Sequence, residues 1–451
     1  MLGRGRRRKS GKSDPSVGIS GGDPRQALQE LSARVHRSWV PPAVEEMVSD
    51  LRLLGHILPL LGADGQIAAD VVAAADAPHD PDALFQAGYQ LIDVGLPEHA
   101  VAPLATALAI TPDAQTALEL IAALEAAESY EQIVTLFTTG YPWAQDLGHP
   151  AVGLFAHAAA MSGNMELVRT LWPKVPPDEA GWGLLQDAIE RLHRYDAVKR
   201  AGRPSGEDDL RAWDAVLYGT LVLTAHDRPM NGRDGVIWDD SASFKAALGV
   251  FRETLDRAGR QPRWVQFVPD RDSVVLAHVL ARLLPDVGAP VPLGTDVAGE
   301  SIVAAFSWSD ADQGMIMSDS GESAILFGYW MDWTRNQGAP HVVAVQAEMV
   351  YPAWGERLRL VPPGDPQPEI ETVPADDRDP DVIAVEILGT SGRPAIDDLF
   401  PEGEAASNDD WQDAAEILAA MLTADAPFGL LNGGFRRYHP GGPVKSDRFL
   451  W

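Results

Sequence analysis

The residues best suited to chemistry follow a short apolar run at residues 264–268, which has the pattern of a β-strand. Four polar residues come soon after it, where a helical pattern begins: Asp270, Arg271, Asp272 and Ser273. Backbone N–H groups at a helix start can hold an anion, and parallel α/β sheets place their ligands at the carboxyl ends of strands. This turn is therefore a candidate site for a phosphorylated ligand.

A second polar turn carries two carboxylates, Asp310 and Asp312, after a predicted strand at 301–306. If both strands belong to one parallel sheet, the two turns lie at the same edge. A structural interpretation competes, because Asp and Ser in the first turn of a helix are what N-capping alone selects. The residue types of Asp270 and Ser273 favour the cap over the ligand site.

Several kinds of chemistry are excluded or receive no support. The chain has no cysteine, so disulfides, thiol catalysis and cysteine-ligated metals are excluded. The 11 histidines are scattered, and the motifs H-E-x-x-H and G-x-G-x-x-G do not occur in the sequence. We therefore assign no catalytic residue, no metal ligand and no cofactor from the sequence.

Alternating strand and helix patterns surround the two polar turns. The predicted strands are 216–224, 264–268, 301–306, 341–350, 357–361 and 382–388, and the predicted helices are 243–258, 273–284 and 411–422. Residues 322–330 fit either type, and residues 362–381, rich in Pro and Asp, are expected to form a loop. This alternation predicts an α/β domain over residues 210–425 with a mixed or partly parallel sheet.

The strand, polar turn and alanine-rich helix around Asp270 resemble one βα unit of a phosphoribosyltransferase-like fold. The resemblance covers roughly 100 residues and implies a nucleotide or sugar phosphate as ligand. That family carries a Gly/Thr-rich phosphate loop after the next strand, whereas this chain has SWSDADQG at 307–314. This departure favours a non-catalytic descendant of such a fold.

The N-terminal half of the chain has a helical pattern, clearest in the stretch 81–114, which is typical of two short antiparallel helices. Asp80 and Pro81 suit the start of the first helix, and Gly95 ends it. A small residue such as Gly88 would let the two helices approach closely. One such pair cannot bury its own apolar face, so the pattern requires neighbouring pairs.

Related stretches recur with a period near 33 residues. The segment EHAV at 98–101 returns as EQIV at 131–134, and the glycines at 88 and 95 have counterparts at 55 and 62. In spacing and small residues the chain resembles the tetratricopeptide repeat, with L-x₂-A-G-x₂-L from Leu84, A-x₃-L from Ala100, and then Pro112. The resemblance implies about four stacked helix pairs between residues 42 and 200. An irregular helical bundle with a chance period is the alternative.

In a solenoid of this kind the first helix of each pair lines the concave face. The family geometry selects residues from two successive pairs: Asp82, Phe85, Gln86, Tyr89 and Asp93, then Thr116, Glu119 and Ala123. Members that grip a peptide's terminal carboxylate use Lys, Arg and Asn at such positions, whereas this chain has acids, Gln and aromatic residues. The resemblance therefore implies a protein or peptide partner with a neutral or basic apolar segment.

The sequence has basic ends although its net charge is −29. We expect a disordered basic tail at 1–23, a tetratricopeptide-like helical repeat domain at 24–200, a linker at 201–209, the α/β domain at 210–425 and an irregular basic tail at 426–451. The negative charge argues against nucleic-acid binding except through the basic tail. We expect no signal peptide, no transmembrane segment and a cytoplasmic location, and acidic surfaces of this kind are common in soluble bacterial proteins.

Two functional hypotheses follow. The first is an interaction or adaptor protein that docks a partner segment in a helical-repeat groove and carries a non-catalytic α/β module. The second is an enzyme or sensor that binds a nucleotide or sugar phosphate near residues 270–273 and 310–312 of the α/β domain. A weaker third hypothesis has the basic tail tether the protein to an anionic surface.

Overall fold

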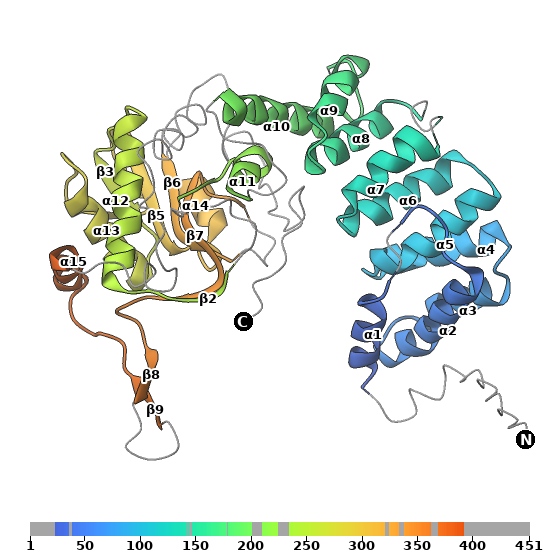
Figure 1. Ribbon diagram of the computed structural model, residues 1–451, viewed down its shortest axis with the longest axis horizontal. Coiled ribbons are helices and arrows are strands. Elements are labelled where there is room, and N and C mark those ends of the chain that lie inside the picture. Colours follow the sequence, from blue (N-terminus) through green and yellow to red (C-terminus); the bar gives the residue numbers. More distant parts are fainter. Residues whose placement is uncertain are drawn as a thin grey trace, which may run out of the picture. The chain divides into compact units, whose positions relative to one another are not determined.

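The computed structural model describes residues 23–35, 38–141, 143, 147–177, 179–200, 210–223, 234–320, 324–332, 338–361 and 369–391 (Figure 1). The chain forms two compact units. The helical unit comprises the chain up to Ser162 together with Thr170–Leu185, and the sheet unit comprises Gly163–Arg169 and the chain from Gln186 onward. Helices build the first unit, and a parallel sheet with helices builds the second, which confirms the predicted α plus α/β fold class.

Short helices joined by tight turns follow one another through the N-terminal half. They are α1 (Pro24–Ser32), α2 (Val44–Leu60), α3 (Gly65–Asp76), α4 (Pro81–Asp93), α5 (Pro97–Ile110), α6 (Ala114–Ala126), α7 (Tyr130–Thr135), the π-helical turn η2 (Leu136–Gly140), α8 (His149–Met161), α9 (Met165–Leu171) and the 3₁₀ turn η4 (Trp172–Lys174). Each helix from α1 to α8 packs against the next. Asp80 caps α4 and Pro81 is its first residue, as predicted.

The turns after alternate helices repeat one backbone conformation. Gly62, Gly95, Glu128 and Gly163 have φ angles of 92°, 76°, 54° and 79°, and they stand 33, 33 and 35 residues apart. This left-handed conformation ends a helix at low cost when the residue is glycine. The period seen in the sequence is therefore also a period of the backbone, and Glu128 adopts the conformation without being glycine.

Two glycines with the same spacing set close helix contacts. A Cβ atom built on Gly55 of α2 would lie 2.4 Å from Cγ2 of Val72 in α3. A Cβ atom on Gly88 of α4 would lie 2.4 Å from Cγ of Leu104 in α5. Both distances are far below an ordinary carbon–carbon contact, so only glycine permits these helix pairs to pack as they do.

The sheet unit alternates strands and helices from α10 onward. Its elements are α10 (Trp182–Arg200), α11 (Leu210–Tyr218), β1 (Leu221–Val222), β2 (Asp234–Trp238), α12 (Ser241–Arg257), β3 (Trp264–Phe267), α13 (Arg271–Leu283), β4 (Val291–Pro292), β5 (Ser301–Ser307), α14 (Gln313–Asp319), β6 (Ile325–Met331), β7 (Val342–Tyr351), β8 (Arg357–Val361), β9 (Glu369–Val373) and α15 (Pro380–Gly389). The main sheet has the order β1-β7-β6-β5-β3-β4, and β2 also pairs with β7. All of these pairings are parallel, and β8 and β9 form a separate antiparallel ribbon.

The central strands are buried along almost their whole length, which is why they are continuous apolar runs. Helix α13 packs against β3 and β5. On α12, Phe251 stacks on Phe327 of β6 with ring centroids 4.2 Å apart. These contacts hold the helices against β3, β5 and β6, and the candidate ligand turns follow the carboxyl ends of β3 and β5.

The predicted strand at 216–224 is wrong over its first part. Helix α11 continues to Tyr218, Gly219 follows it with a φ of 69°, and β1 is only two residues long. The described residues of α11 are nearly all buried, and its last three residues, Val216, Leu217 and Tyr218, are as apolar as the strand that follows, so the sequence does not mark where the helix ends.

Two arginines of α10 hold the part of this helix after Leu185 to the sheet unit. Arg194 Nε donates to the carbonyl oxygen of Val216 (2.7 Å), and Arg191 Nε donates to that of Leu217 (3.2 Å). These carbonyls lie at the end of α11, where no partner exists within the helix and where the helix dipole favours a cation. The boundary between the units accordingly falls within α10, and the predicted linker 201–209 lies outside the described residues.

The predicted strand at 382–388 is also wrong, because this segment is the helix α15. The Asp379 side chain caps its start and Pro380 is its first residue. At its end, Lys245 Nζ of α12 donates to the carbonyl oxygen of Leu388 at 2.7 Å. The sequence shows where this helix begins, through Asp379 and Pro380. It gives no local sign of the helix end, because Lys245 is 143 residues away from Leu388.

The remaining predicted segments agree with the structure only in part. The strand β6 covers most of the ambiguous residues 322–330 and extends to Met331, and the predicted loop 362–381 contains the strand β9. Ile370, Thr372 and Val373 are β-branched residues typical of strands, a signal that the surrounding Pro and Asp obscured. The predicted helix 411–422 and the tail 426–451 lie outside the described residues, as does nearly all of the tail 1–23.

Candidate functional site

The candidate ligand turn after β3 is a helix cap that also anchors a strand. Asp270 Oδ1 accepts a hydrogen bond from the Ser273 main-chain N–H (2.8 Å), and the Ser273 hydroxyl donates to Asp270 Oδ2 (2.5 Å). The same hydroxyl oxygen accepts from the main-chain N–H of Phe306 in β5 (2.9 Å). Ser273 is fully buried. These groups therefore join α13 to β5, as the capping interpretation predicted.

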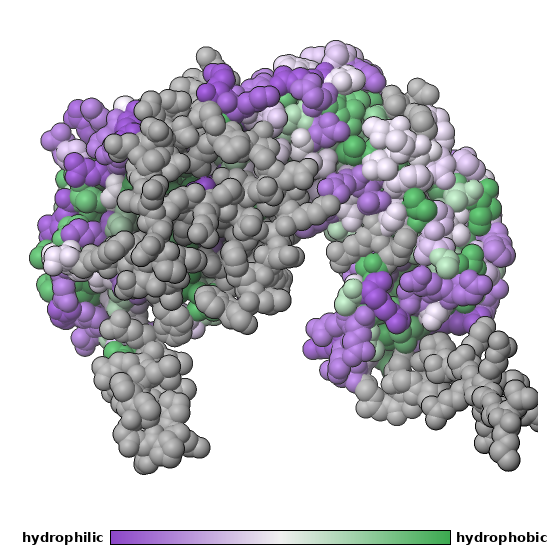
Figure 2. All heavy atoms as spheres, viewed as in Figure 1, coloured by the Kyte–Doolittle hydropathy of each residue, from purple (hydrophilic) through white to green (hydrophobic). Residues whose placement is uncertain are grey.

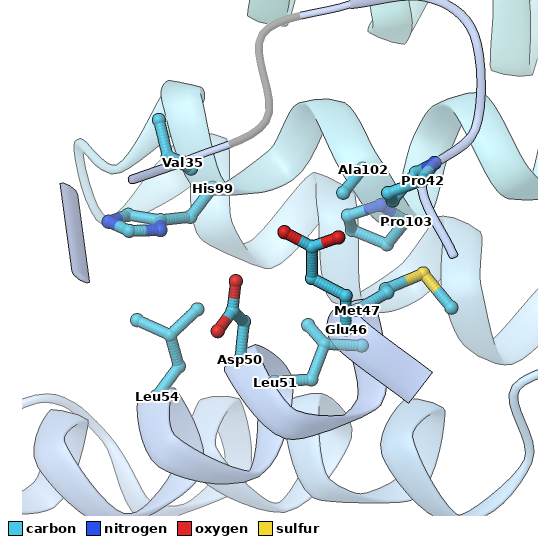
Figure 3. Close-up of a pocket in the computed structure, with 10 residues that line it drawn as sticks. All are labelled: Val35, Pro42, Glu46, Met47, Asp50, Leu51, Leu54, His99, Ala102 and Pro103. Carbon is cyan, nitrogen blue, oxygen red and sulfur yellow. The ribbon is translucent and has the colours of Figure 1, made fainter. Parts of the chain in front are cut away.

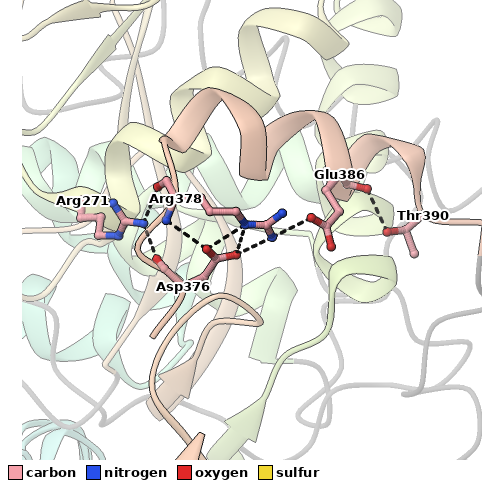
Figure 4. Close-up of polar contacts among 5 residues, drawn as sticks. All are labelled: Arg271, Asp376, Arg378, Glu386 and Thr390. Carbon is pink, nitrogen blue, oxygen red and sulfur yellow. Dashed lines mark hydrogen bonds and ion pairs between the residues drawn. The ribbon is translucent and has the colours of Figure 1, made fainter. Parts of the chain in front are cut away.

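Arg271 and Asp272 fasten the chain after β7 to the same turn. The Arg271 guanidinium donates to the carbonyl oxygens of Asp376 and Arg378, the latter at 2.8 Å (Figure 4). Asp272 Oδ1 accepts from the indole N–H of Trp354 (2.7 Å). Burial raises the pKa of Asp272, and this hydrogen bond opposes the rise. Both side chains therefore hold packed segments of the chain together.

The two carboxylates after β5 are likewise turn residues. Asp310 accepts a hydrogen bond from the Ser307 hydroxyl (2.7 Å), and Asp312 caps α14 by accepting from the main-chain N–H of Met315 (3.0 Å). The parallel pairing of β3 with β5 does bring this turn and the turn at 270–273 to one edge of the sheet. Each acid, however, holds its own turn.

The same edge contains a buried acid–phenol pair that sequence reasoning missed. The Tyr329 hydroxyl donates to Asp239 Oδ2 at 2.5 Å, and both residues are buried. Burial raises the pKa of Asp239 to about 7, although the hydrogen bond from Tyr329 opposes the rise. Burial and, next, the Asp239 carboxylate raise the pKa of Tyr329. Asp239 stands beside Asp240 in a pattern typical of a turn, and its partner Tyr329 lies 90 residues away, so no local signal reveals the pair.

Aromatic rings pack around Tyr329 near the carboxyl ends of the strands. Its ring centroid lies 4.5 Å from that of Phe244 and 5.2 Å from that of Phe306. Trp354 meets Phe244 edge to face at 4.9 Å. Trp308 is buried as well. Tryptophans of this region are therefore core residues, and among the described residues no group of three or more His, Asp or Glu side chains is placed to hold a metal ion.

The predicted groove residues of α4 lie on its solvent side. Asp82, Gln86, Tyr89 and Asp93 are exposed, and Phe85 is half-buried. The rings of Phe85 and Tyr89 stack with centroids 6.4 Å apart, and Tyr89 is 40% exposed. Helix α4 therefore presents an aromatic pair flanked by acids.

Of the three predicted groove residues on α6, one is accessible and two are buried. Thr116 is buried, and its N–H and hydroxyl donate to the Asp113 carboxylate at 2.9 and 2.6 Å, so it is part of a helix cap and not available to a partner. Ala123 is also buried. Glu119 is accessible, and burial first and the Asp93 carboxylate second raise its pKa. Asp93 and Glu119 thus bring two acids together across α4 and α6.

We call Phe85, Tyr89, Asp93 and Glu119 the α4–α6 surface. On the visible face of the helical unit, hydrophobic residues form small patches between hydrophilic ones rather than one broad area (Figure 2). Isolated exposed apolar side chains, such as Leu60, fit this mixture. A surface of this kind suits a segment that combines polar and apolar residues.

A small hollow lies between α2 and α5 (Figure 3). The carboxylates of Glu46 and Asp50 point into it, and the imidazole of His99 lies at one side (Figure 3). The remaining lining is apolar: Val35, Pro42, Met47, Leu51, Leu54, Ala102 and Pro103. Sequence reasoning missed this hollow because its residues come from three separate segments, each of which reads as ordinary helix or connection.

Comparison with known proteins adds no relative. No protein-family model matches the chain, and neither a curated protein nor a solved structure matches it. Within the described ranges, the helices are all too short or too polar to cross a membrane.

Proposed function

We propose that this protein binds a partner segment through its helical repeats, and that the α4–α6 surface is the docking site. One observation carries the proposal: two accessible acids from different helices, Asp93 and Glu119, meet beside the stacked pair Phe85 and Tyr89. Aromatic side chains supply much of the binding energy of protein interfaces. Burial of Glu119 and the Asp93 charge near it favour a cation at this place.

The partner segment that suits this surface carries Arg or Lys next to an apolar residue. Its apolar side chain would cover the ring of Tyr89, while its cation would lie between Asp93 and Glu119. A cation near the aromatic faces also gains from the ring quadrupole. The resemblance to tetratricopeptide repeats supports the same class of function.

The nucleotide or sugar-phosphate hypothesis draws no such support from the described residues. Asp270, Ser273, Arg271 and Asp272 all take part in the packing of α13, β5 and the segment after β7. Aromatic side chains also occupy the neighbouring carboxyl ends of the strands. A ligand there would have to displace these contacts.

Selection of peptides from a random library, with the full-length chain as bait, tests which partner segments this surface prefers. The enriched peptides should combine a basic residue with a neighbouring apolar one. Enrichment should fall at least about tenfold with Phe85→Ala/Tyr89→Ala and with Asp93→Asn/Glu119→Gln. Leu118→Ala is the matched control, because Leu118 is an exposed apolar residue of α6 outside this surface. The proposal would be refuted if both double variants kept the enrichment and the melting temperature of the wild-type chain.

A further inference from the structure

The contacts of β6 distinguish the two faces of the main sheet. Phe327 stacks on Phe251 of α12 and therefore lies on a first face. Because successive side chains of a strand point to opposite faces, Leu326 and Gly328 lie on the other one. The register of the parallel strands places further residues there. We call this side the second face, and its residues include Gln266, Val303, Ala305, Leu326, Gly328 and Val343.

The longer described helices of the sheet unit pack on the first face. Asp272 of α13 accepts from the indole of Trp354, whose ring meets Phe244 of α12. Helices α12 and α13 are thus neighbours on the first face (Figure 1). Helix α11 joins them, because the side-chain amide of Gln346, which the register places on the first face, donates to the Asp214 carboxylate at 2.7 Å.

The described elements give the second face less cover. Trp308 packs over Gly328, since a Cβ atom added to this glycine would lie 3.0 Å from Trp308 Cβ. The Trp308 indole donates to the carbonyl oxygen of Gly338 (2.7 Å), and the Gly338 N–H donates to Gln313 at the start of α14 (2.9 Å). Helix α14 has seven residues. A parallel sheet needs cover on both faces, and this turn and α14 supply it for one end of the second face.

Two buried polar atoms lie on or beside the second face without a partner among the described residues: Gln266 Oε1 and His341 Nε2. Gln266 Nε2 donates to Ser301 Oγ (3.3 Å), so the amide is held in place. His341 Nδ1 accepts from the Leu326 N–H (3.0 Å), and burial lowers the pKa of His341 to about 4, so the neutral ring carries its proton on Nε2. Unpaired buried polar atoms are costly, so the cover of this face should bring a donor and an acceptor.

The segment 407–422, which lies outside the described residues, has the pattern that such a cover requires. At 3.6 residues per turn, apolar residues gather on one side of the helix predicted for 411–422: Trp411, Ala415, Leu418 and Leu422. Gln412, Asp413 and Glu416 fall on the other side. The residues before this helix, SNDD at 407–410, carry hydrogen-bond donors and acceptors.

The described chain ends where this segment can reach the second face. Lys245 of α12 holds the carbonyl oxygens of Leu388 and Thr390 at 2.7 and 2.8 Å, so the end of α15 is fixed to the first-face helices. The residues from 392 to 410 can span up to about 60 Å when extended. Packed layers lie only about 10 Å apart, so this length is ample to pass to the other side of the sheet.

We propose that residues 411–422 form an amphipathic helix that docks on the second face, with its apolar side against Leu326 and Val343. The polar residues 407–410 then supply the donor and the acceptor that the buried atoms at this face lack. The docking uses no residue of the α4–α6 surface, so it stands independently of the proposed function.

Cysteine cross-linking on the full-length chain tests the docking, because the sequence has no cysteine of its own. One cysteine replaces Val345, a half-buried residue of β7 on the second face. A second replaces each residue from 411 to 422 in turn, and a short bismaleimide links the pair. Linking within one chain should be at least about tenfold faster for Leu418→Cys than for Glu416→Cys. The maxima should recur about every 3.6 residues.

A second anchor on the other side of the sheet unit is the matched control. Val382 is an exposed residue of α15, which packs on α12 and α13. Val382→Cys should link to Leu418→Cys at least about tenfold more slowly than Val345→Cys does. Independently of cross-linking, Leu418→Asp should lower the melting temperature of the full-length chain, whereas Glu416→Gln should not.

Three outcomes would overturn the proposal. The first is linking from Val345→Cys that is absent or shows no helical period in variants that keep the wild-type melting temperature. The second is equal linking from Val382→Cys. The third is linking between chains instead of within one, detected by mixing chains of two different masses, which would assign the second face to another copy of the protein.

Discussion

Replacing Gly88 with alanine tests the packing on which the helical unit depends. A Cβ atom at this position would lie 2.4 Å from Cγ and 2.8 Å from Cδ2 of Leu104. Ordinary carbon–carbon contacts are about 3.5–4.0 Å, so the overlap is roughly 1 Å. Leu104 is completely buried and cannot turn into solvent. Helices α4 and α5 must therefore move apart or their side chains must leave their preferred rotamers.

The size of the effect is the difference between two terms. Overpacking a core costs about 1–3 kcal/mol, and exchanging glycine for alanine inside a helix gains about 1 kcal/mol. With so close an overlap we expect Gly88→Ala to lower the local free energy of unfolding by about 1–2 kcal/mol. Gly65→Ala is the control in the same unit, because no atom lies within 4 Å of its new Cβ atom. It should be neutral or slightly stabilising.

Hydrogen exchange of peptides from α4 and α5, followed by mass spectrometry on the full chain, reads this local stability. Leu104→Ala alone should cost about 2–5 kcal/mol. Combined with Gly88→Ala it should cost at least about 1 kcal/mol less than the sum of the single variants, because the new methyl group enters the space vacated by Leu104. Strictly additive effects, or a stabilising Gly88→Ala, would refute the close approach of α4 and α5.

Other perturbations should act on the sheet unit. Folding raises the pKa of Asp239 from 3.8 to about 7, so the free energy of unfolding should fall as pH rises between these values, by up to about 1.4 kcal/mol per pH unit. In urea unfolding between pH 5 and 8, the Asp239→Asn variant should depend less on pH than the wild-type chain. Arg194→Met should cost about 2–3 kcal/mol because it strips charged donors from the end of α11, whereas the exposed Arg200→Met should cost little in the same assay. Asp270→Ala should lower the melting temperature through loss of a cap worth about 1 kcal/mol. ATP and phosphoribosyl compounds should leave the melting temperature of the wild-type chain unchanged, and a saturable rise would instead restore the ligand hypothesis.

Local signals in the sequence were enough to place most of the elements. Asp80 and Pro81 mark the start of α4, and Gly95 marks its end, because caps and left-handed turns are set by neighbouring residues. The strands β3, β5 and β7 are apolar runs that need burial on both faces, and their places were predicted closely. The period of 33 residues was visible for the same reason, since each turn repeats a local requirement.

Long-range contacts determined what the sequence could not show. Helix α11 depends on Arg191 and Arg194 from α10, and α15 depends in part on Lys245 from α12. Thr116 fits the groove by spacing, but the cap formed with Asp113 turns it inward. No pattern within one segment reveals such partners.

The sheet unit and the helical unit differ in the groups that they offer to a ligand or partner. Near the carboxyl ends of its strands, where α/β folds usually bind ligands, the sheet unit has aromatic packing and the buried pair of Asp239 and Tyr329. The helical unit instead holds two partly buried carboxylates, Asp50 and Glu119, whose pKa is raised by burial. A basic, partly apolar segment suits the acids and aromatic rings of the α4–α6 surface, which is why we propose recognition by the helical unit.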